Sequence, residues 1–180
     1  MDRNIIIHCA HCVTSMITVK DSMVLIHLAK TSLLENACAF FGKILIPLSV
    51  LHEIRQGALN HIEDVAVIER AIKERAISVK SVKDKALLRR ANEFNIKGGE
   101  AEAVALYWQE RAAWLATDDD NVRKKKNALA LNVIGTPAIM IRLWRDGSIT
   151  KERYLAAVKK LRESGWFSSI VYDVMLMEAR

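Results

Sequence analysis

The segment WLATDDDNVRKKKNALALNVIGT (residues 114–136) changes character twice within a short distance. An apolar run ends in three consecutive aspartates, four consecutive cations follow, and a second apolar run begins near Leu131. Short apolar runs bounded by turn residues predict strands, and residues 121–131 between them have helical character. Three adjacent carboxylates repel one another, so they suit a solvated turn, a helix cap or part of a cation site. The segment therefore predicts a strand, a helix and a second strand, with acids where the first strand ends.

The same alternation extends over the rest of the chain. Short β-branched segments that predict strands lie at residues 16–21, 43–48, 76–82, 112–118 and 131–136. Helical patterns lie between them, at residues 22–41, 48–75, 83–94, 99–112 and 121–131. Such alternation predicts an α/β fold, a three-layer α/β/α sandwich with a parallel sheet of about five strands. Further helical patterns at 137–147 and 150–166 predict a carboxy-terminal helical appendage.

Composition limits the class of protein. The chain has 180 residues, of which 51% are hydrophobic, so it suits one domain with a substantial core. No apolar run approaches the roughly 20 residues that span a bilayer, and no membrane helix is expected. The amino terminus lacks the cationic start of a secretory signal, and three cysteines do not make a disulfide framework, so we expect an intracellular, cytoplasmic protein. The net charge of +6 permits attraction to a polyanion without requiring it.

Acidic residues recur where the predicted strands end. Asp21 follows the first strand and Asp118 to Asp120 follow the fourth, at the edge where parallel sheets collect functional groups. Glu53 and Glu102 lie in predicted helices, the second of them apolar nearly all round. Each acid alone also suits a helix cap, a surface position or an ion pair. At about 4 Å, however, each like-charged pair would cost about 4 kcal/mol, so the set indicates a hard cation, Mg²⁺ or Mn²⁺.

The order of four motifs resembles the PIN-domain nuclease family. These motifs are DSMVLIHLAK (21–30), LSVLHEIRQG (48–57), GGEAEAVALY (98–107) and LATDDDNVRKKKNALALNVIGT (115–136), and the resemblance runs from about Met16 to the end. Carried over residue by residue, it implies that the catalytic and metal-binding residues are Asp21, Glu53, Glu102 and Asp119, with Asp118 as an alternative metal ligand. The resemblance also implies that Ser22 and Thr117 support this site.

Residues 132–176 further resemble a prokaryotic PIN subgroup related to the VapC toxins. This resemblance implies an Mg²⁺- or Mn²⁺-dependent endoribonuclease that hydrolyses RNA, the toxin of a toxin–antitoxin pair, with an antitoxin protein as partner and a homodimeric state. The tail SGWFSSIVYDVMLM (164–177) carries residue types that interfaces favour, which also suits self-association. The alternatives are a catalytically weak or inactive PIN-like module that binds RNA or protein, and a phosphatase of another parallel-sheet family.

Three features qualify this interpretation. Met23 stands where the family's first motif commonly has a small polar residue, and its thioether is a poor hydrogen-bonding group. Asp120 is expected to cap the helix that starts at Asn121. The cations at 123–126 suit either a solvated helix face or a patch that contacts phosphate.

The amino-terminal segment HCAHC (8–12) has the side chains of a zinc site. Four ligands from five successive residues cannot easily surround one tetrahedral ion, and no second pair of ligands at suitable spacing follows, so zinc is disfavoured. We expect an amino-terminal extension of unknown role at residues 1–15 and a PIN-like domain at 16–145. A helical appendage at 146–180 is expected to pack on the same domain.

Overall fold

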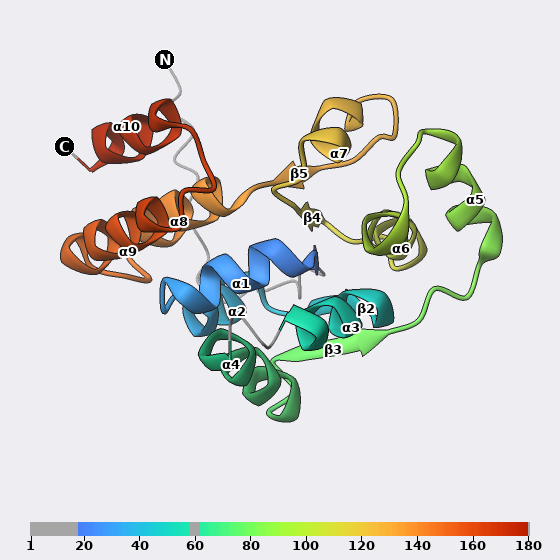
Figure 1. Ribbon diagram of the computed structural model, residues 1–180, viewed down its shortest axis with the longest axis horizontal. Helices are drawn as coiled ribbons and strands as arrows, with labels where there is room; N and C mark the ends of the chain where they lie inside the picture. Colours follow the sequence, from blue (N-terminus) through green and yellow to red (C-terminus); the bar gives the residue numbers. More distant parts are fainter. Residues whose placement is uncertain (1–17, 58–61, 180) are drawn as a thin grey trace, which may run out of the picture.

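The computed structural model describes residues 18–57 and 62–179, so the HCAHC segment lies outside the described residues. Its strands form one five-stranded parallel sheet in the order β3-β2-β1-β4-β5 (Figure 1). The strands are β1 (Thr18–Lys20), β2 (Ile44–Pro47), β3 (Ile77–Lys80), β4 (Trp114–Ala116) and β5 (Val133–Ile134). Each lies within one of the predicted strand segments. The predicted α/β/α sandwich with a parallel sheet is confirmed.

Helices connect the strands and follow the last one. They are α1 (Ser22–Lys30), α2 (Leu34–Phe41), α3 (Leu48–Gln56), α4 (Ile62–Lys73), α5 (Lys85–Glu93), α6 (Gly98–Gln109), α7 (Asp120–Lys125), α8 (Thr136–Arg145), α9 (Lys151–Glu163) and α10 (Ser169–Glu178). The pattern at 22–41 therefore forms two helices rather than one, because Ser32 takes a left-handed backbone with φ of 59° between them. The helix expected over 121–131 ends early, at Lys125.

The sheet separates two hydrophobic clusters. Successive side chains of a strand point to opposite faces, so Ile44 and Ile46 contribute to one cluster and Leu45 to the other. The first cluster is completed by residues of α1 to α4 and α8 to α10, and the second by residues of α5 to α7 and their flanking turns. Both faces of the sheet are thus covered, as its parallel strands require.

The last three helices pack on the α1 and α2 side of the molecule, where Figure 1 shows them together in orange and red. Two buried tyrosines join α9 to α10: the Tyr154 hydroxyl donates to Met175 O at 2.8 Å, and the Tyr172 hydroxyl donates to Leu161 O at 3.0 Å. A domain boundary at residue 145 stays a prediction, because α8 to α10 share one hydrophobic cluster with α1 to α4. Among the described residues, no helix has the length and apolar character needed to cross a membrane.

The pairing of β1 with β4 positions the acidic residues. Lys20 of β1 lies opposite Ala116 of β4, and the backbone N–H of Asp21 donates to Ala116 O at 3.0 Å. The chain therefore leaves both strands at the same level of the same edge. As the sequence predicted, Asp21 and the aspartates after Thr117 lie at neighbouring strand ends.

Candidate active site

Asp21 is the N-cap of α1. Its Oδ1 accepts a hydrogen bond from Val24 N at 2.9 Å, which satisfies one of the free N–H groups of the first turn. The side chain is buried, and burial raises the pKa of Asp21 to about 7. Hydrogen bonds from Thr117 and the Val24 N–H offset part of this rise in pKa, and the nearby Asp118 carboxylate adds to it. Burial therefore favours the protonated form of Asp21 up to near neutral pH.

Asp119 is the N-cap of α7, and this corrects the capping role expected for Asp120. The Asp119 Oδ1 accepts from Val122 N at 2.7 Å, and its own backbone N–H donates to Thr117 Oγ1 at 3.1 Å. Asp120 is already the first residue of the helix and is exposed. The cap lies one residue earlier than expected, because only a residue with extended backbone outside the helix can turn its carboxylate back onto the first turn.

Asp118 is buried in a hydrogen-bonded cluster on the far side of the same turn. Its Oδ1 accepts from Thr136 N at 2.7 Å, and its Oδ2 accepts from Thr136 Oγ1 at 2.5 Å and lies 3.0 Å from His27 Nδ1. His27 of α1 is buried as well. Asp118 bridges the threonine and the histidine, whereas a nucleophilic triad would need the histidine in the middle. The cluster therefore fixes α1, the 117–120 turn and α8 to one another.

Glu53 reaches the same edge from α3. The Ser22 hydroxyl donates to its Oε2 at 2.9 Å, which links the last part of α3 to the first residue of α1. The Glu53 carboxylate also lies against Gly99, where an added Cβ would come within 2.1 Å of Oε1. Helix α6 starts at Gly98, with φ of 59°, and has no side-chain cap. The carboxylate thus lies beside the positive amino end of α6.

The two glutamates of α6 lie in different surroundings. Glu102 accepts a hydrogen bond from the Ser49 hydroxyl at 2.8 Å. Its partner is thus a serine of α3 rather than the arginine of an ion pair. Glu100 lies two residues nearer the start of α6 and is partly buried, and its pKa is raised by this burial and then by the charges of Asp119 and Glu53.

One cavity of about 310 Å³ joins these groups. Its lining residues come from α1, α3, the start of α6, the turn before α7 and the turn after α9: Asp21, Ser22, Met23, Val50, Glu53, Lys97, Gly98, Gly99, Glu100, Asp119 and Trp166. Of the residues that the sequence predicted, Asp21, Glu53 and Asp119 line the cavity, while Glu102 and Asp118 do not. Sequence reasoning missed Glu100 and Trp166. Glu100 carried a usable signal, a carboxylate in the first turn of a helix, whereas Trp166 carried none.

A buried cation lies behind the cavity. Lys20, the last residue of β1, is fully buried, and its Nζ lies 4.6 Å from the centre of the Phe41 ring. Within the described part of the chain, Nζ has no hydrogen-bond partner. Burial lowers the pKa of Lys20 to about 8, although the charges of Cys38, Asp21 and Asp118 oppose this shift. Lys20 therefore supplies a positive charge next to Asp21 without pairing directly with it.

The donor set suits a divalent cation in chemical type. Carboxylate oxygens are the ligands that hard divalent cations prefer, and the raised pKa values of Asp21 and Glu100 reflect burial and like charge that a cation would offset. These carboxylates do not converge on one position, however. In residues 18–57 and 62–179, no group of three or more His, Cys, Asp or Glu side chains is placed to hold one ion. A bound cation would be held by Asp21, Glu53, Asp119 and Glu100.

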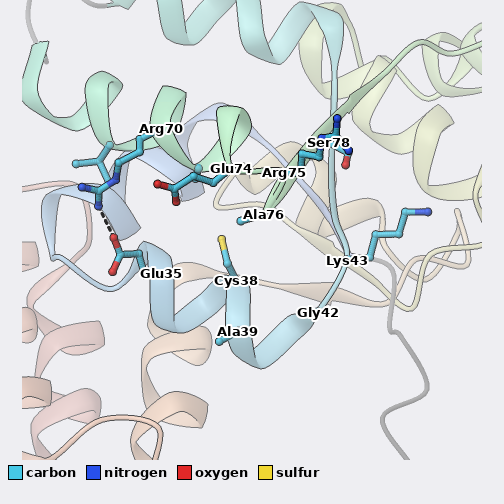
Figure 2. Close-up of a pocket in the computed structure, with 12 residues that line it drawn as sticks. Glu35, Cys38, Ala39, Gly42, Lys43, Arg70, Glu74, Arg75, Ala76 and Ser78 are labelled. Atoms are coloured by element: carbon cyan, nitrogen blue, oxygen red, sulfur yellow. Dashed lines mark hydrogen bonds and ion pairs between the residues drawn. The ribbon is translucent and has the colours of Figure 1, made fainter.

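Other cavities lie outside this acidic site, and two of them bear on its assignment. The larger, about 470 Å³, lies between α2, α4 and the start of β3 (Figure 2), and its lining includes Cys38, Lys43 and the ion pair of Glu35 with Arg70. It lies at the amino ends of β2 and β3, opposite the edge where parallel sheets bind substrates. Its larger volume therefore does not make this cavity the functional site.

The second cavity, about 400 Å³, lies between α7 and α8 and is lined by cations. Arg123, Lys124 and Lys126 come from α7 and the turn after it, and Arg142 comes from α8. The Arg142 guanidinium lies 4.4 Å from the centre of the Trp114 ring, which also lines the cavity. Asp120 lines this cavity while its neighbour Asp119 lines the acidic one, so the two cavities lie on either side of the same turn.

The fold and site define a class of protein: a parallel α/β/α sandwich that gathers carboxylates at the carboxyl ends of β1 and β4. A family model described as a PIN domain matches residues 17–180. The chain therefore belongs to the PIN-domain family, whose members are generally nucleases and typically use divalent metals. Searches of the curated proteins and of the solved structures each found no match.

Proposed function

We propose that this PIN-domain protein is a metal-dependent endoribonuclease that hydrolyses RNA phosphodiester bonds, as the toxin of a toxin–antitoxin pair. The observation that carries the proposal is the cavity lined by Asp21, Glu53, Glu100 and Asp119 at the carboxyl edge of the sheet. Carboxylates from four separate segments are costly to hold together unless a cation, Mg²⁺ or Mn²⁺, offsets their repulsion.

The chain's own residues account for the position of the reacting groups. Both aspartates are fixed by backbone N–H groups of the helices that they cap, so their carboxylates are held in one orientation before substrate arrives. When bound, a divalent cation supplies positive charge for the phosphate oxygens and lowers the pKa of water. Glu100 lines the same cavity as the two aspartates, so its carboxylate would help to hold that cation.

RNA is the favoured substrate because the acidic cavity adjoins a cationic one. Arg123, Lys124, Lys126 and Arg142 line that neighbouring cavity, and such a cluster attracts the phosphate backbone of a polynucleotide more than it would a small phosphate ester. This observation favours the phosphate-contacting interpretation of the cationic run over that of a solvated helix face.

The test measures cleavage of a single-stranded RNA and of a small phosphate ester, each with and without Mn²⁺. We expect Mn²⁺-dependent RNA cleavage that Asp119→Asn abolishes, while Asp173→Asn on the exposed face of α10 leaves it unchanged. RNA binding without cleavage would establish the binding-module alternative. Hydrolysis of the small ester alone would establish a phosphatase instead.

We also propose that the protein self-associates and that an antitoxin protein is its regulatory partner. The support for self-association is a row of exposed apolar side chains on α10, Ile170, Val174 and Met177. Support for the antitoxin comes from the resemblance of residues 132–176 to VapC-related proteins. A pull-down from the native source, followed by inhibition of RNA cleavage by the captured protein, tests that partner.

A further inference from the structure

Apolar side chains contribute to the lining of the acidic cavity. Trp166, in the turn between α9 and α10, lines the cavity together with Met23 from the first turn of α1. The Trp166 side chain is 53% exposed, although tryptophan is usually largely buried. An indole therefore borders the cavity that holds the carboxylates, with much of its surface open to solvent.

Buried neighbours hold the Trp166 ring in place. The His27 ring packs edge-on against it, with ring centres 5.6 Å apart, and the same histidine contacts Phe167 at 5.5 Å. His27 is itself fixed by Asp118, whose carboxylate is fixed by Thr136. Three segments far apart in sequence thus support the indole. An exposed aromatic ring with a rigid support loses little conformational entropy when a flat ligand stacks on it.

We propose that Trp166, with Met23 lining the same cavity, forms a subsite for an unpaired nucleobase next to the scissile phosphate. The inference rests on the proposed nuclease function and specifies its substrate as single-stranded RNA. Carboxylates suit the phosphate and its cation, whereas an indole face suits the base attached to the same nucleotide, because every base has a face that can stack. A duplex keeps its bases stacked on one another, so it cannot offer one to Trp166.

The subsite also gives Met23 a role. A small polar residue at this position would offer hydrogen bonds to the metal site, whereas methionine adds polarisable apolar surface to the lining of the cavity that Trp166 borders. The departure from the family's usual motif and the exposed indole therefore occur in the same cavity, where both favour contact with a base over contact with water.

The experiment compares RNA binding by Trp166→Ala and Trp166→Phe in an Asp119→Asn background, which keeps the RNA intact. The probes are a fluorescent single-stranded oligoribonucleotide, its duplex, and an abasic strand of equal length. We expect Trp166→Ala to weaken binding of the single strand by about 5- to 150-fold and Trp166→Phe to weaken it less. Binding of the abasic strand and of the duplex should not change. Ile62→Ala, at an exposed apolar residue outside both the cavity and α10, is the matched control.

Equal loss of binding for the single strand and the abasic strand would overturn the subsite, and so would unchanged binding of both. Light scattering on Trp166→Ala gives an independent check, because dissociation of an oligomer would assign the indole to a protein interface instead. The two proposals fail separately. RNA cleavage that does not depend on Trp166 removes the subsite and keeps the nuclease, whereas base-dependent binding without any cleavage removes the nuclease and keeps the subsite.

Discussion

The three consecutive aspartates lie in three different environments. Asp118 is buried and bonded to Thr136 and His27, Asp119 caps α7 and faces the acidic cavity, and Asp120 is exposed beside the cationic cavity. One turn of backbone sends successive side chains in different directions, so adjacent like charges are kept apart. The repulsion that the sequence suggested within this run is therefore largely avoided, and the acids that approach one another come from other segments.

This separation predicts different outcomes for two matched substitutions. Asp119→Asn keeps an oxygen that can cap α7, so we expect little change in unfolding free energy but a loss of RNA cleavage of at least about 100-fold. Asp118→Asn loses an acceptor inside a buried cluster, so the unfolding free energy should fall by about 1–3 kcal/mol. Urea unfolding and cleavage rates measure both effects. If Asp118→Asn abolished cleavage at unchanged stability, Asp118 would belong to the reactive site.

A second pair of substitutions separates the two glutamates of α6. Glu100 lines the cavity and is influenced by the charges of Asp119 and Glu53, whereas Glu102 bonds to Ser49. We expect Glu100→Gln to weaken Mn²⁺ binding by at least about tenfold. Glu102→Gln should have a smaller effect, because a glutamine oxygen can still accept from the serine hydroxyl. Isothermal titration with Mn²⁺ compares them. A larger effect at Glu102 would support the ligand set that the family resemblance implied.

At the scale of elements, local patterns predicted the strands because each lies in a short, largely apolar segment, and all but β4 contain β-branched residues. The helix limits were harder, since the breaks depend on single residues in unusual backbone conformations. Ser32 ends α1 with a φ of 59° although serine does not announce such a turn, and its carbonyl accepts from Arg153 of α9 at 2.9 Å. A contact between residues 121 positions apart supports that break, so no local pattern could reveal it.

The candidate site was predictable to the extent that it follows from topology. Asp21 and Asp119 were expected together because parallel neighbouring strands end at one edge. Glu100 and Glu102 point to different sides of α6, so which of them faces the cavity depends on how that helix is rotated against α3, and this rotation is set by tertiary packing. Trp166 reaches the cavity only through the packing of α9 and α10 against α1, which joins segments distant in sequence.

Packing of α3 against α6 gives a further prediction. A methyl group on Gly99 would lie 2.1 Å from Glu53 Oε1, so Gly99→Ala must move this carboxylate by about 1 Å, and displacements of that size can cost about 100-fold in rate. Because the obstructed atom ends a flexible side chain, the unfolding free energy should change by less than about 1 kcal/mol. Gly57→Ala is the control, since its Cβ would meet nothing within 4 Å. Equal cleavage rates for both variants would show that the position of Glu53 is unimportant.

At the scale of the whole molecule, α10 is the element best placed for association of two copies. Ile170, Val174 and Met177 recur at helical spacing and are 71%, 49% and 62% exposed. We expect a dimer at micromolar concentration by light scattering, and dissociation to monomers in the double variant Ile170→Lys, Met177→Lys. Ile62→Lys, at an equally exposed apolar residue of α4, should leave the dimer intact. A wild-type protein that is monomeric would rule out this association.

Buried charge also links global stability to pH. Asp21 has a folded pKa of about 7 against an ordinary value of 3.8, so the folded protein binds more protons than the unfolded chain between these values. The stability that the protonated Asp21 carboxyl contributes is fully present below about pH 4 and is lost as pH rises through 7. Lys20 changes stability in the opposite direction to Asp21, and it does so at higher pH. Its folded pKa of about 8 lies below 10.5, so stability recovers as pH rises between these values.

The expected result without divalent cations is that Asp21→Asn becomes more stable than the wild type as pH rises from 4 to 8, because asparagine retains the cap and carries no charge. The difference in unfolding free energy should approach about 4 kcal/mol above pH 7 and vanish near pH 4. Mn²⁺ should narrow this difference, since a cation held by Asp21, Glu53 and Asp119 stabilises the ionised wild type and binds the variant poorly. Urea titrations at pH 4, 6 and 8, with and without Mn²⁺, measure both effects. If the difference were independent of pH and of Mn²⁺, neither the raised pKa of Asp21 nor its role as a cation ligand would stand.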